Sequence, residues 1–148
     1  MYTKILAPLD GSKFSECSLE HVRAIAQGCG IPEVILLMVN EPVHVAYGMG
    51  EDWVRESEAK QKAEAEEYLS RLAKDLKKEG MAASIVLLKG MPAEEILNYA
   101  KKNNVGLIVM STHGRAGVSR WLMGSVAERI SRYSPVPLLL VAPPGCKR

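Results

Sequence analysis

The segment Glu33–Asn40, with the sequence EVILLMVN, contains six consecutive apolar residues between two polar ends. A strand that is exposed on one face alternates apolar and polar residues, whereas a strand covered on both faces is apolar throughout. The segment therefore predicts a central strand of a sheet that carries helices on both faces.

The rest of the chain alternates strand-like and helix-like segments around this strand. Apolar runs followed by turn residues predict four more strands, at Lys4–Leu9, Ser84–Leu88, Val105–Met110 and Pro135–Val141. Apolar spacing and helix-start residues predict helices over Ser15–Cys29, over Glu51–Glu79, from Pro92 onward and over Ser125–Arg132. This alternation predicts an α/β fold with a doubly wound, Rossmann-like parallel sheet of strand order 3-2-1-4-5. The two prolines of the last segment favour an edge position for that strand.

Length and composition exclude several other classes of protein. The chain has 148 residues, which is typical of a single domain. Its formal charge of +2 is too small to indicate a nucleic-acid-binding surface, and no segment has the apolar length that a membrane span needs. Cys17, Cys29 and Cys146 have neither disulfide-type nor metal-type spacing. We therefore expect a cytoplasmic protein without nucleic-acid or membrane partners.

The predicted sheet order places a binding crevice between the first and fourth strands. The loops there would be 10–12 and 111–124. Gly114 and Gly117 can adopt a positive φ and allow backbone N–H groups to approach a ligand. Gly124 and Ser125 stand where a helix begins, and the N-terminus of a helix attracts anions. The pattern predicts a phosphate site, with Asp10 as an acceptor for a ribose hydroxyl.

Each of these residues also has a structural interpretation. Ser125-Val-Ala-Glu128 matches a capping box, and Asp10 before Gly-Ser is typical of a turn. His113 can be a turn residue, a packed ring or a catalytic base, although the sequence identifies no catalytic partner for it. Arg115 and Arg120 can be solvated or can contact an outer phosphate. The chain contains neither GxxxxGK[ST] nor a GxGxxG after the first strand.

Four segments resemble the universal stress protein family over nearly the whole chain, which would make residues 1–148 one domain of that family. These segments are APLDGS at 7–12, VILLMVNE at 34–41, KGMPAEEI at 89–96 and VMSTHGRAGVSRWLMGSVAERISRYSPVPLLLV at 109–141. The nucleotide-binding branch of the family has the pattern G-x2-G-x9-G-[S/T]. Gly114, Gly124 and Ser125 match its last three positions, but Ser111 replaces the first glycine, and Ser is disfavoured if that position needs a positive φ.

The resemblance implies a site for ATP, or for ADP or AMP, with Mg²⁺ or Mn²⁺ between the phosphates. It assigns Asp10 to the ribose, and its other contacts to the adenosine and the phosphates are Pro8, Val39, Met110, Ser111, Gly114, Gly124, Ser125 and the amide of Val126. It further implies a stress-response or signalling homodimer that pairs through Leu138–Val141. No catalytic residue and no metal ligand from the protein is assigned, and hydrolysis would be slow at most. The alternatives are an interaction dimer that has lost nucleotide binding, which Ser111 favours, and a weak nucleotide hydrolase that uses His113.

Overall fold

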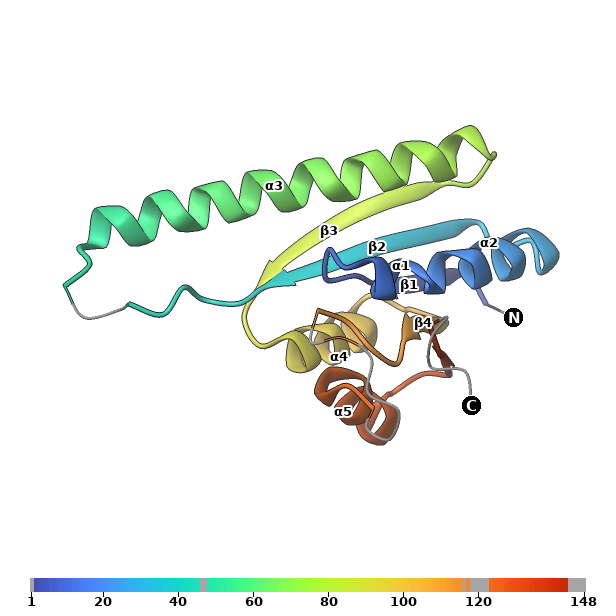
Figure 1. The fold of residues 1–148 in the computed structure, drawn as a ribbon. Helices are drawn as coiled ribbons and strands as arrows, with labels where there is room; N and C mark the ends of the chain where they lie inside the picture. The colour runs from blue at the N-terminus through green and yellow to red at the C-terminus, as the bar shows by residue number, and fades with distance from the viewer. Residues whose placement is uncertain (1, 46–47, 116, 118–122, 144–148) are drawn as a thin grey trace.

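The computed structural model describes residues 2–45, 48–115, 117 and 123–143, so Arg120 and Cys146 lie outside the described part of the chain (Figure 1). Strands and helices alternate within it as the sequence predicts. Their order is β1 (Lys4–Pro8), α1 (Lys13–Glu16), α2 (Ser18–Gly28), β2 (Glu33–Asn40), α3 (Glu51–Lys78), β3 (Ala83–Lys89), α4 (Pro92–Lys102), β4 (Leu107–Ser111), α5 (Ser125–Tyr133) and β5 (Leu138–Val141).

The five strands form one parallel sheet in the order β3-β2-β1-β4-β5, which confirms the predicted topology. All six apolar residues of β2 are buried, as expected for a strand covered on both faces. β5 lies at the edge of the sheet, next to β4. The strands therefore end together at one edge, where a parallel sheet binds its ligands.

Helices cover both faces of the sheet (Figure 1). On one face, α2 and α3 bury apolar side chains such as Val22 and Leu69 against β1, β2 and β4. On the other face, α4 and α5 bury Ile96 and Ile130 against the alternate residues of the same strands. Because side chains of a strand alternate between faces, each strand contributes to both cores.

Several element boundaries differ from the prediction by a few residues, and hydrogen bonding explains the differences at the first helix and the last strand. The first predicted helix begins earlier, at Lys13, because the hydroxyl of Ser12 accepts a hydrogen bond from the amide of Ser15 and caps α1. The helix is also divided at Cys17 into α1 and α2. The last strand begins at Leu138 rather than at Pro135, because Pro135 and Pro137 have no N–H to donate.

β1 and β4 pair at Ile5–Leu107 and at Leu6–Ile108, although both strands continue beyond these pairs. The sheet thus opens between Pro8 and Ser111, at the position where the strand order reverses. In the described residues, no helix has both the length and the apolar composition of a membrane span.

Candidate functional site

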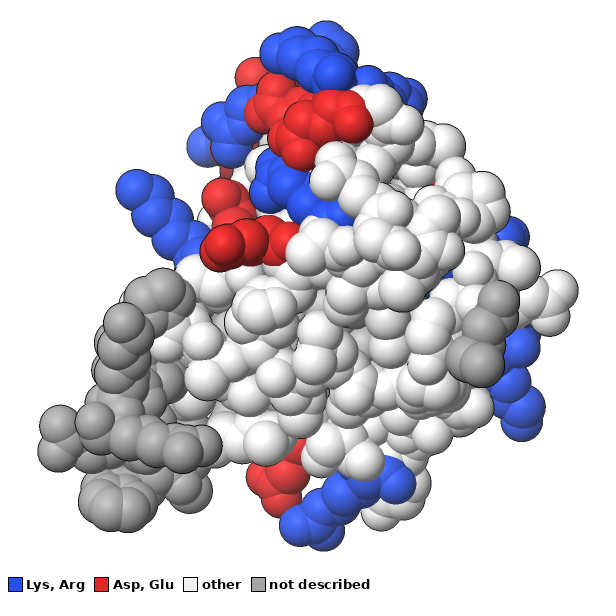
Figure 2. Space-filling model, turned by 90° about the vertical axis from the view of Figure 1, so that its right-hand side faces the viewer, with Lys and Arg blue, Asp and Glu red and all other residues white. Residues whose placement is uncertain are grey.

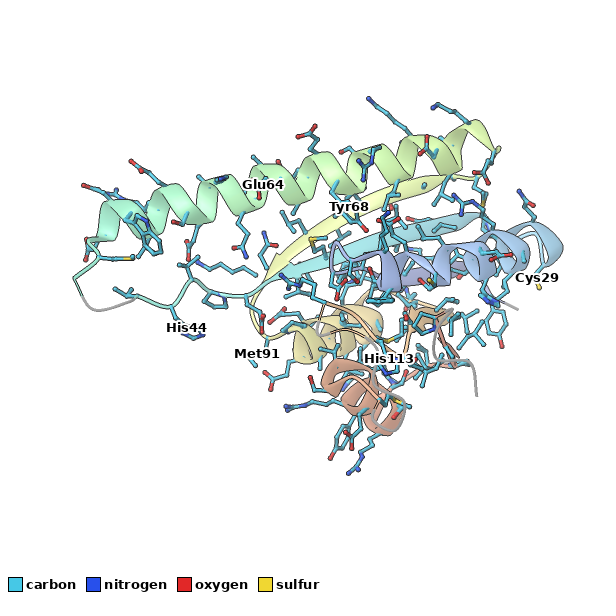
Figure 3. All side chains as sticks on the ribbon, in the orientation of Figure 1. Cys29, His44, Glu64, Tyr68, Met91 and His113 are labelled. Atoms are coloured by element: carbon cyan, nitrogen blue, oxygen red, sulfur yellow. The ribbon has the colours of Figure 1, made fainter. Side chains whose placement is uncertain are left out.

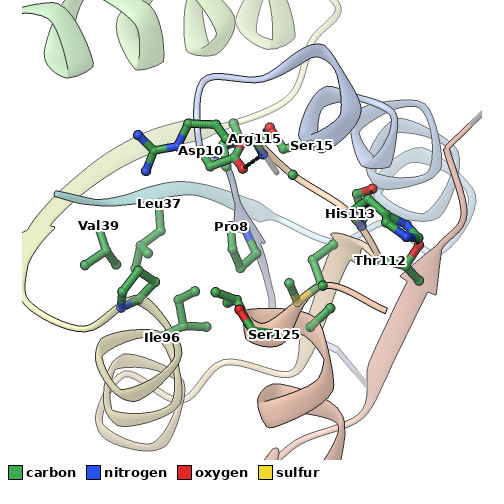
Figure 4. Close-up of a pocket in the computed structure, with 18 of the residues that line it drawn as sticks. Pro8, Asp10, Ser15, Leu37, Val39, Ile96, Thr112, His113, Arg115 and Ser125 are labelled. Atoms are coloured by element: carbon green, nitrogen blue, oxygen red, sulfur yellow. Dashed lines mark hydrogen bonds between the residues drawn. The ribbon is translucent and has the colours of Figure 1, made fainter. Parts of the chain in front are cut away.

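A cavity of about 280 Å³ lies in this opening, at the carboxyl ends of β1, β2 and β4 (Figure 4). All nine residues that the sequence predicts for the nucleotide site line this one cavity. They are Pro8, Asp10, Val39, Met110, Ser111, Gly114, Gly124, Ser125 and Val126. The fold therefore brings together residues from four separate segments of the chain.

The turn after β1 holds the carboxylate of Asp10 in a fixed position. Oδ1 of Asp10 accepts hydrogen bonds from the amide of Ser12 at 2.9 Å and from its hydroxyl at 2.6 Å. The hydroxyl of Ser15 accepts a bond from the amide of Asp10 at 3.3 Å and donates to the carbonyl of Ser12 at 2.8 Å. Asp10 is thus a turn residue that still lines the cavity, so the two interpretations of its sequence context coexist.

The hydrogen bonds of Asp10 also control its charge. Burial by itself favours the neutral carboxyl, but the hydrogen bonds from the side chain and amide of Ser12 and from the amide of Arg115 outweigh burial and hold the pKa of Asp10 below its ordinary value. Asp10 is therefore an acceptor at neutral pH. A carboxylate has about four lone-pair sites and three of them are used here, so one remains for a ligand donor.

Asp10 also joins the two sides of the cavity. Its Oδ2 accepts a hydrogen bond from the amide of Arg115, in the loop after β4, at 2.7 Å (Figure 4). A Cβ at Gly114 would lie 2.0 Å from the same oxygen, so this position has no space for a side chain. The prediction of a positive φ was wrong for Gly114 but is confirmed for Gly117, which has a φ of 85°. Glycine is required at position 114 because the Asp10 carboxylate approaches it closely, and not because its φ is positive.

The N-terminus of α5 forms the opposite wall of the cavity. Gly124 is the N-cap residue, with φ −58° and ψ 143°, and its carbonyl accepts the first helical bond from Glu128 at 2.9 Å. Ser125 is therefore the first residue of the helix, and the predicted capping box is wrong. The carboxylate of Glu128 instead pairs with Arg132 at 2.8 Å.

With Gly124 as its cap residue, the N-terminus of α5 is accessible to a ligand. No side chain caps α5 within the described residues, and Ser125 and Val126 line the cavity. The amide of Gly124 is an exception, because it donates to the carbonyl of Thr112 at 2.8 Å. A Cβ at Gly124 would lie 3.0 Å from the same carbonyl oxygen, so this glycine also serves the closure of the loop.

Ser111 does not have the backbone conformation that would exclude serine. It is the last residue of β4, it pairs with Val141, and it is buried. Among the described residues other than glycine, a positive φ occurs at Asn104. The first position of the glycine pattern is thus extended in this chain, and its hydroxyl accepts a bond from the amide of His113 at 3.3 Å.

The polar side chains of the β4 loop are held in different ways. Nδ1 of His113 and the hydroxyl of Thr112 are 2.8 Å apart, and both residues line the cavity. Arg115 is exposed, and Figure 4 shows its guanidinium extending away from His113 over the side of the cavity where Val39 lies. His113 therefore has a hydroxyl partner, whereas Arg115 is the cation at the rim.

The other end of the cavity is apolar. Pro8, Val39 and Met110 lie there as predicted, and the sequence interpretation missed Leu37 and Ile96 beside them. Leu37 could have been found, because residues two apart on a strand share a face with one another. Ile96 comes from α4, and its place in the wall depends on how that helix packs. The cavity thus combines an apolar end with a helix N-terminus and the fixed carboxylate of Asp10.

The comparisons with known proteins agree with this architecture. Residues 1–142 match the Universal stress protein family. The chain is 34% identical over 144 residues to the universal stress protein MJ0531 of Methanocaldococcus jannaschii, covering 97% of this chain and 84% of that protein. It is 33% identical to the solved structure of MJ0577 from the same organism, with a TM-score of 0.87 and 97% and 98% of the two chains covered. A family structure from Arabidopsis thaliana with AMP bound shares the fold, with 16% identity, a TM-score of 0.68 and 96% and 92% of the chains covered. The chain therefore belongs to the universal stress protein family.

Proposed function

We propose that this protein binds an adenine nucleotide, ATP or its products ADP or AMP, in the cavity between β1 and β4. It would do so in the cytoplasm, as a homodimer with a stress-response or signalling role, and residues 1–148 would form one domain. The proposal rests on one observation above the others. A single cavity combines an apolar end, a fixed carboxylate at Asp10 and the N-terminus of α5.

Each part of a nucleotide has a chemical counterpart in this cavity. The apolar side chains of Val39, Leu37 and Ile96 suit the faces of a purine base. The remaining acceptor site of Asp10 suits one ribose hydroxyl, and the backbone donors and dipole at the start of α5 suit the phosphates. The relative from Arabidopsis thaliana with AMP bound supports adenine as the base.

A divalent ion would enter with the nucleotide. The described residues contain no group of three or more His, Cys, Asp and Glu side chains that could hold a metal by themselves. Mg²⁺ is usually bound by one or two carboxylates together with substrate phosphates, so this donor set fits an ion held mainly by phosphate oxygens. Asp10 and Glu41 are the carboxylates that line the cavity. The ion would neutralise phosphate charge beside them.

Ser111 favoured the alternative of an interaction dimer without nucleotide. Because the backbone at Ser111 is extended, serine brings no strain to this position. Serine at position 111 is therefore no longer an argument for an interaction dimer without nucleotide.

The hydrolase alternative depends on His113. A general base must lie within hydrogen-bond reach of the water that it activates. The ring instead lies against the Thr112 hydroxyl, which supports a structural role. Turnover of ATP by His113→Ala should equal the slow rate of the wild type, and a large loss of turnover would favour the hydrolase.

Isothermal titration with ATP, ADP, AMP and GTP, with and without Mg²⁺, tests the proposed function. We expect saturable binding of an adenine nucleotide, with GTP bound more weakly. Absence of saturable binding below millimolar nucleotide would reject the proposal.

We further propose that the dimer forms through the open edge of β5. The carbonyls of Pro137 and Val141 accept hydrogen bonds from β4, so the backbone of Leu138 and Leu140 faces the other edge. An apolar edge strand with free backbone groups is a site for pairing with another chain. Figure 2 shows the side of the molecule on which α2 ends, where the centre of the face carries uncharged residues and the charged residues lie toward its borders.

Leu140→Pro tests this interface, because proline removes an outward N–H without removing a bond to β4. Sedimentation should show a monomer for Leu140→Pro and a dimer for Leu140→Ala, which loses the same side chain but keeps the N–H. A dimer in both variants would place the interface elsewhere.

A further inference from the structure

A side chain of α3 contacts the turn that holds Asp10, although α3 itself does not line the cavity. Tyr68 is half-buried on the side of α3 that faces the sheet (Figure 3). Its hydroxyl donates a hydrogen bond to Oε1 of Glu16, the last residue of α1, at 2.9 Å. This bond joins segments 52 residues apart.

α1 depends on such external contacts for its position. It has four residues, and a single helical turn is not stable in isolation. Its start is fixed by Ser12 and Ser15, which bond to one another and to Asp10. Its end is fixed by Tyr68 through Glu16. The N-cap residue of this short helix, Ser12, thus orients the carboxylate, and its last residue, Glu16, is the one that α3 holds.

The Tyr68 hydroxyl keeps its proton at physiological pH. Burial, the hydrogen bond to Glu16 and the negative charge of Glu16 raise the pKa of Tyr68 far above its usual range. The hydroxyl therefore keeps its proton and remains a donor to the Glu16 carboxylate.

We propose that Tyr68 is a positioning residue of the nucleotide site, which acts through Glu16, Ser12 and Ser15 on the carboxylate that contacts the ribose. This inference rests on the proposed function, because it requires that Asp10 accepts a ribose hydroxyl. Recognition of the sugar would then also depend on α3, through Tyr68. By thermodynamic linkage, a partner that displaces α3 would weaken nucleotide binding, and bound nucleotide would oppose that displacement.

The test compares ATP with dideoxy-ATP, which lacks both ribose hydroxyls, in the wild type, Tyr68→Phe and Glu16→Ala. A hydrogen bond to a charged group predicts that the wild type prefers ATP by roughly 10- to 100-fold. Both variants should reduce this preference several-fold and leave the affinity for dideoxy-ATP unchanged. The double variant should lose no more than either single one, because both remove the same bond. Tyr99→Phe, in α4 and away from the cavity, is the matched control and should keep the full preference.

The outcomes separate this inference from the proposed function. If the wild type binds neither nucleotide, the proposed function fails. If the wild type prefers ATP and Tyr68→Phe keeps that preference, the inference is overturned and the proposed function stands. An equal loss of affinity for both nucleotides also overturns the inference, because it indicates a general effect on the fold.

Discussion

The two sides of the cavity are built from different kinds of interaction. On the β1 side, the hydroxyl of Ser12 donates to the Asp10 carboxylate, and the hydroxyl of Ser15 accepts from the Asp10 amide, so that one acceptor is fixed. On the β4 side, the backbone of Gly114, Gly124 and Ser125 forms the wall, and no side chain in the described part of the chain caps the helix behind it. One side therefore presents a fixed charge, and the other presents backbone donors.

Under the proposed function, this difference would allow one cavity to recognise two parts of one ligand. An ionised carboxylate can only accept hydrogen bonds and therefore suits a hydroxyl donor. Backbone N–H groups at the start of a helix suit phosphate oxygens instead. The bond between Asp10 and the amide of Arg115 holds the two sides at a fixed separation. Substitutions at the contact between the sides, and then on each side separately, test this difference.

Gly114→Ala should have the largest effect, because it forces the two sides apart. Its Cβ would lie 2.0 Å from Oδ2 of Asp10, and the Arg115–Asp10 hydrogen bond would be lost. Overpacking and loss of a charged hydrogen bond together predict a decrease of about 2–4 kcal/mol in the free energy of unfolding. Denaturant unfolding measures this decrease.

A double variant identifies the cause of this effect. In an Asp10→Ala background the collision is absent, so Gly114→Ala should cost much less. Gly117→Ala is the control within the same loop: no heavy atom of the other described residues lies within 4 Å of its Cβ position, and its φ of 85° opposes a side chain. It should cost about 1–2 kcal/mol. Equal costs for Gly114→Ala in both backgrounds would contradict the proposed contact.

Ser125→Pro tests the backbone side alone. Proline is favoured at the first residue of a helix, and the extended conformation of Gly124 is compatible with a following proline. The variant removes one N–H that would face the phosphates in the proposed site, so nucleotide affinity should fall by roughly 10- to 100-fold while the unfolding free energy is kept. Titration calorimetry measures the affinity.

Two controls accompany this variant. Ser125→Ala removes the hydroxyl but keeps the amide, and it should change affinity much less. Glu51→Pro places the same residue at the start of α3, which also follows a glycine in an extended conformation, and it should leave binding unchanged. Unchanged affinity in Ser125→Pro would exclude this amide from the phosphate site.

The smallest effect is the pH dependence of the Asp10 side. Because the folded pKa of Asp10 is lowered from its ordinary value of 3.8, the carboxylate stabilises the fold above that pH. This stabilisation should be lost as the pH falls through the lowered pKa. The unfolding free energies of the wild type and Asp10→Asn should therefore differ at neutral pH and converge in acid. A difference that is independent of pH would contradict a hydrogen-bonded carboxylate.

The sequence predicts the sheet well because an apolar run indicates a buried strand whatever the detailed packing around that strand. The run in β2 and the prolines before β5 suffice for a central strand and an edge strand, respectively. Nine of the residues lining the cavity were expected from the family resemblance, position by position. Their local geometry was not, because it depends on contacts between distant segments.

Gly114 and Ser125 show where the sequence interpretation reaches its limit. The need for glycine at 114 comes from Asp10, which is 104 residues earlier in the chain, and no local pattern contains that contact. At α5 the local pattern fits a serine cap, yet the tie between Gly124 and Thr112 moves the cap back by one residue. At both positions, hydrogen bonds between distant segments determine the local structure.

The most direct test of the account is nuclear magnetic resonance of the isotope-labelled wild type during titration with ATP and Mg²⁺. The account predicts saturable shift changes at the amides of Ser125 and Val126 together with changes at Asp10, Ser12 and Arg115, all with one dissociation constant. Changes confined to another surface, such as the groove between α3 and β3 that Glu58 and Lys89 line, would contradict it.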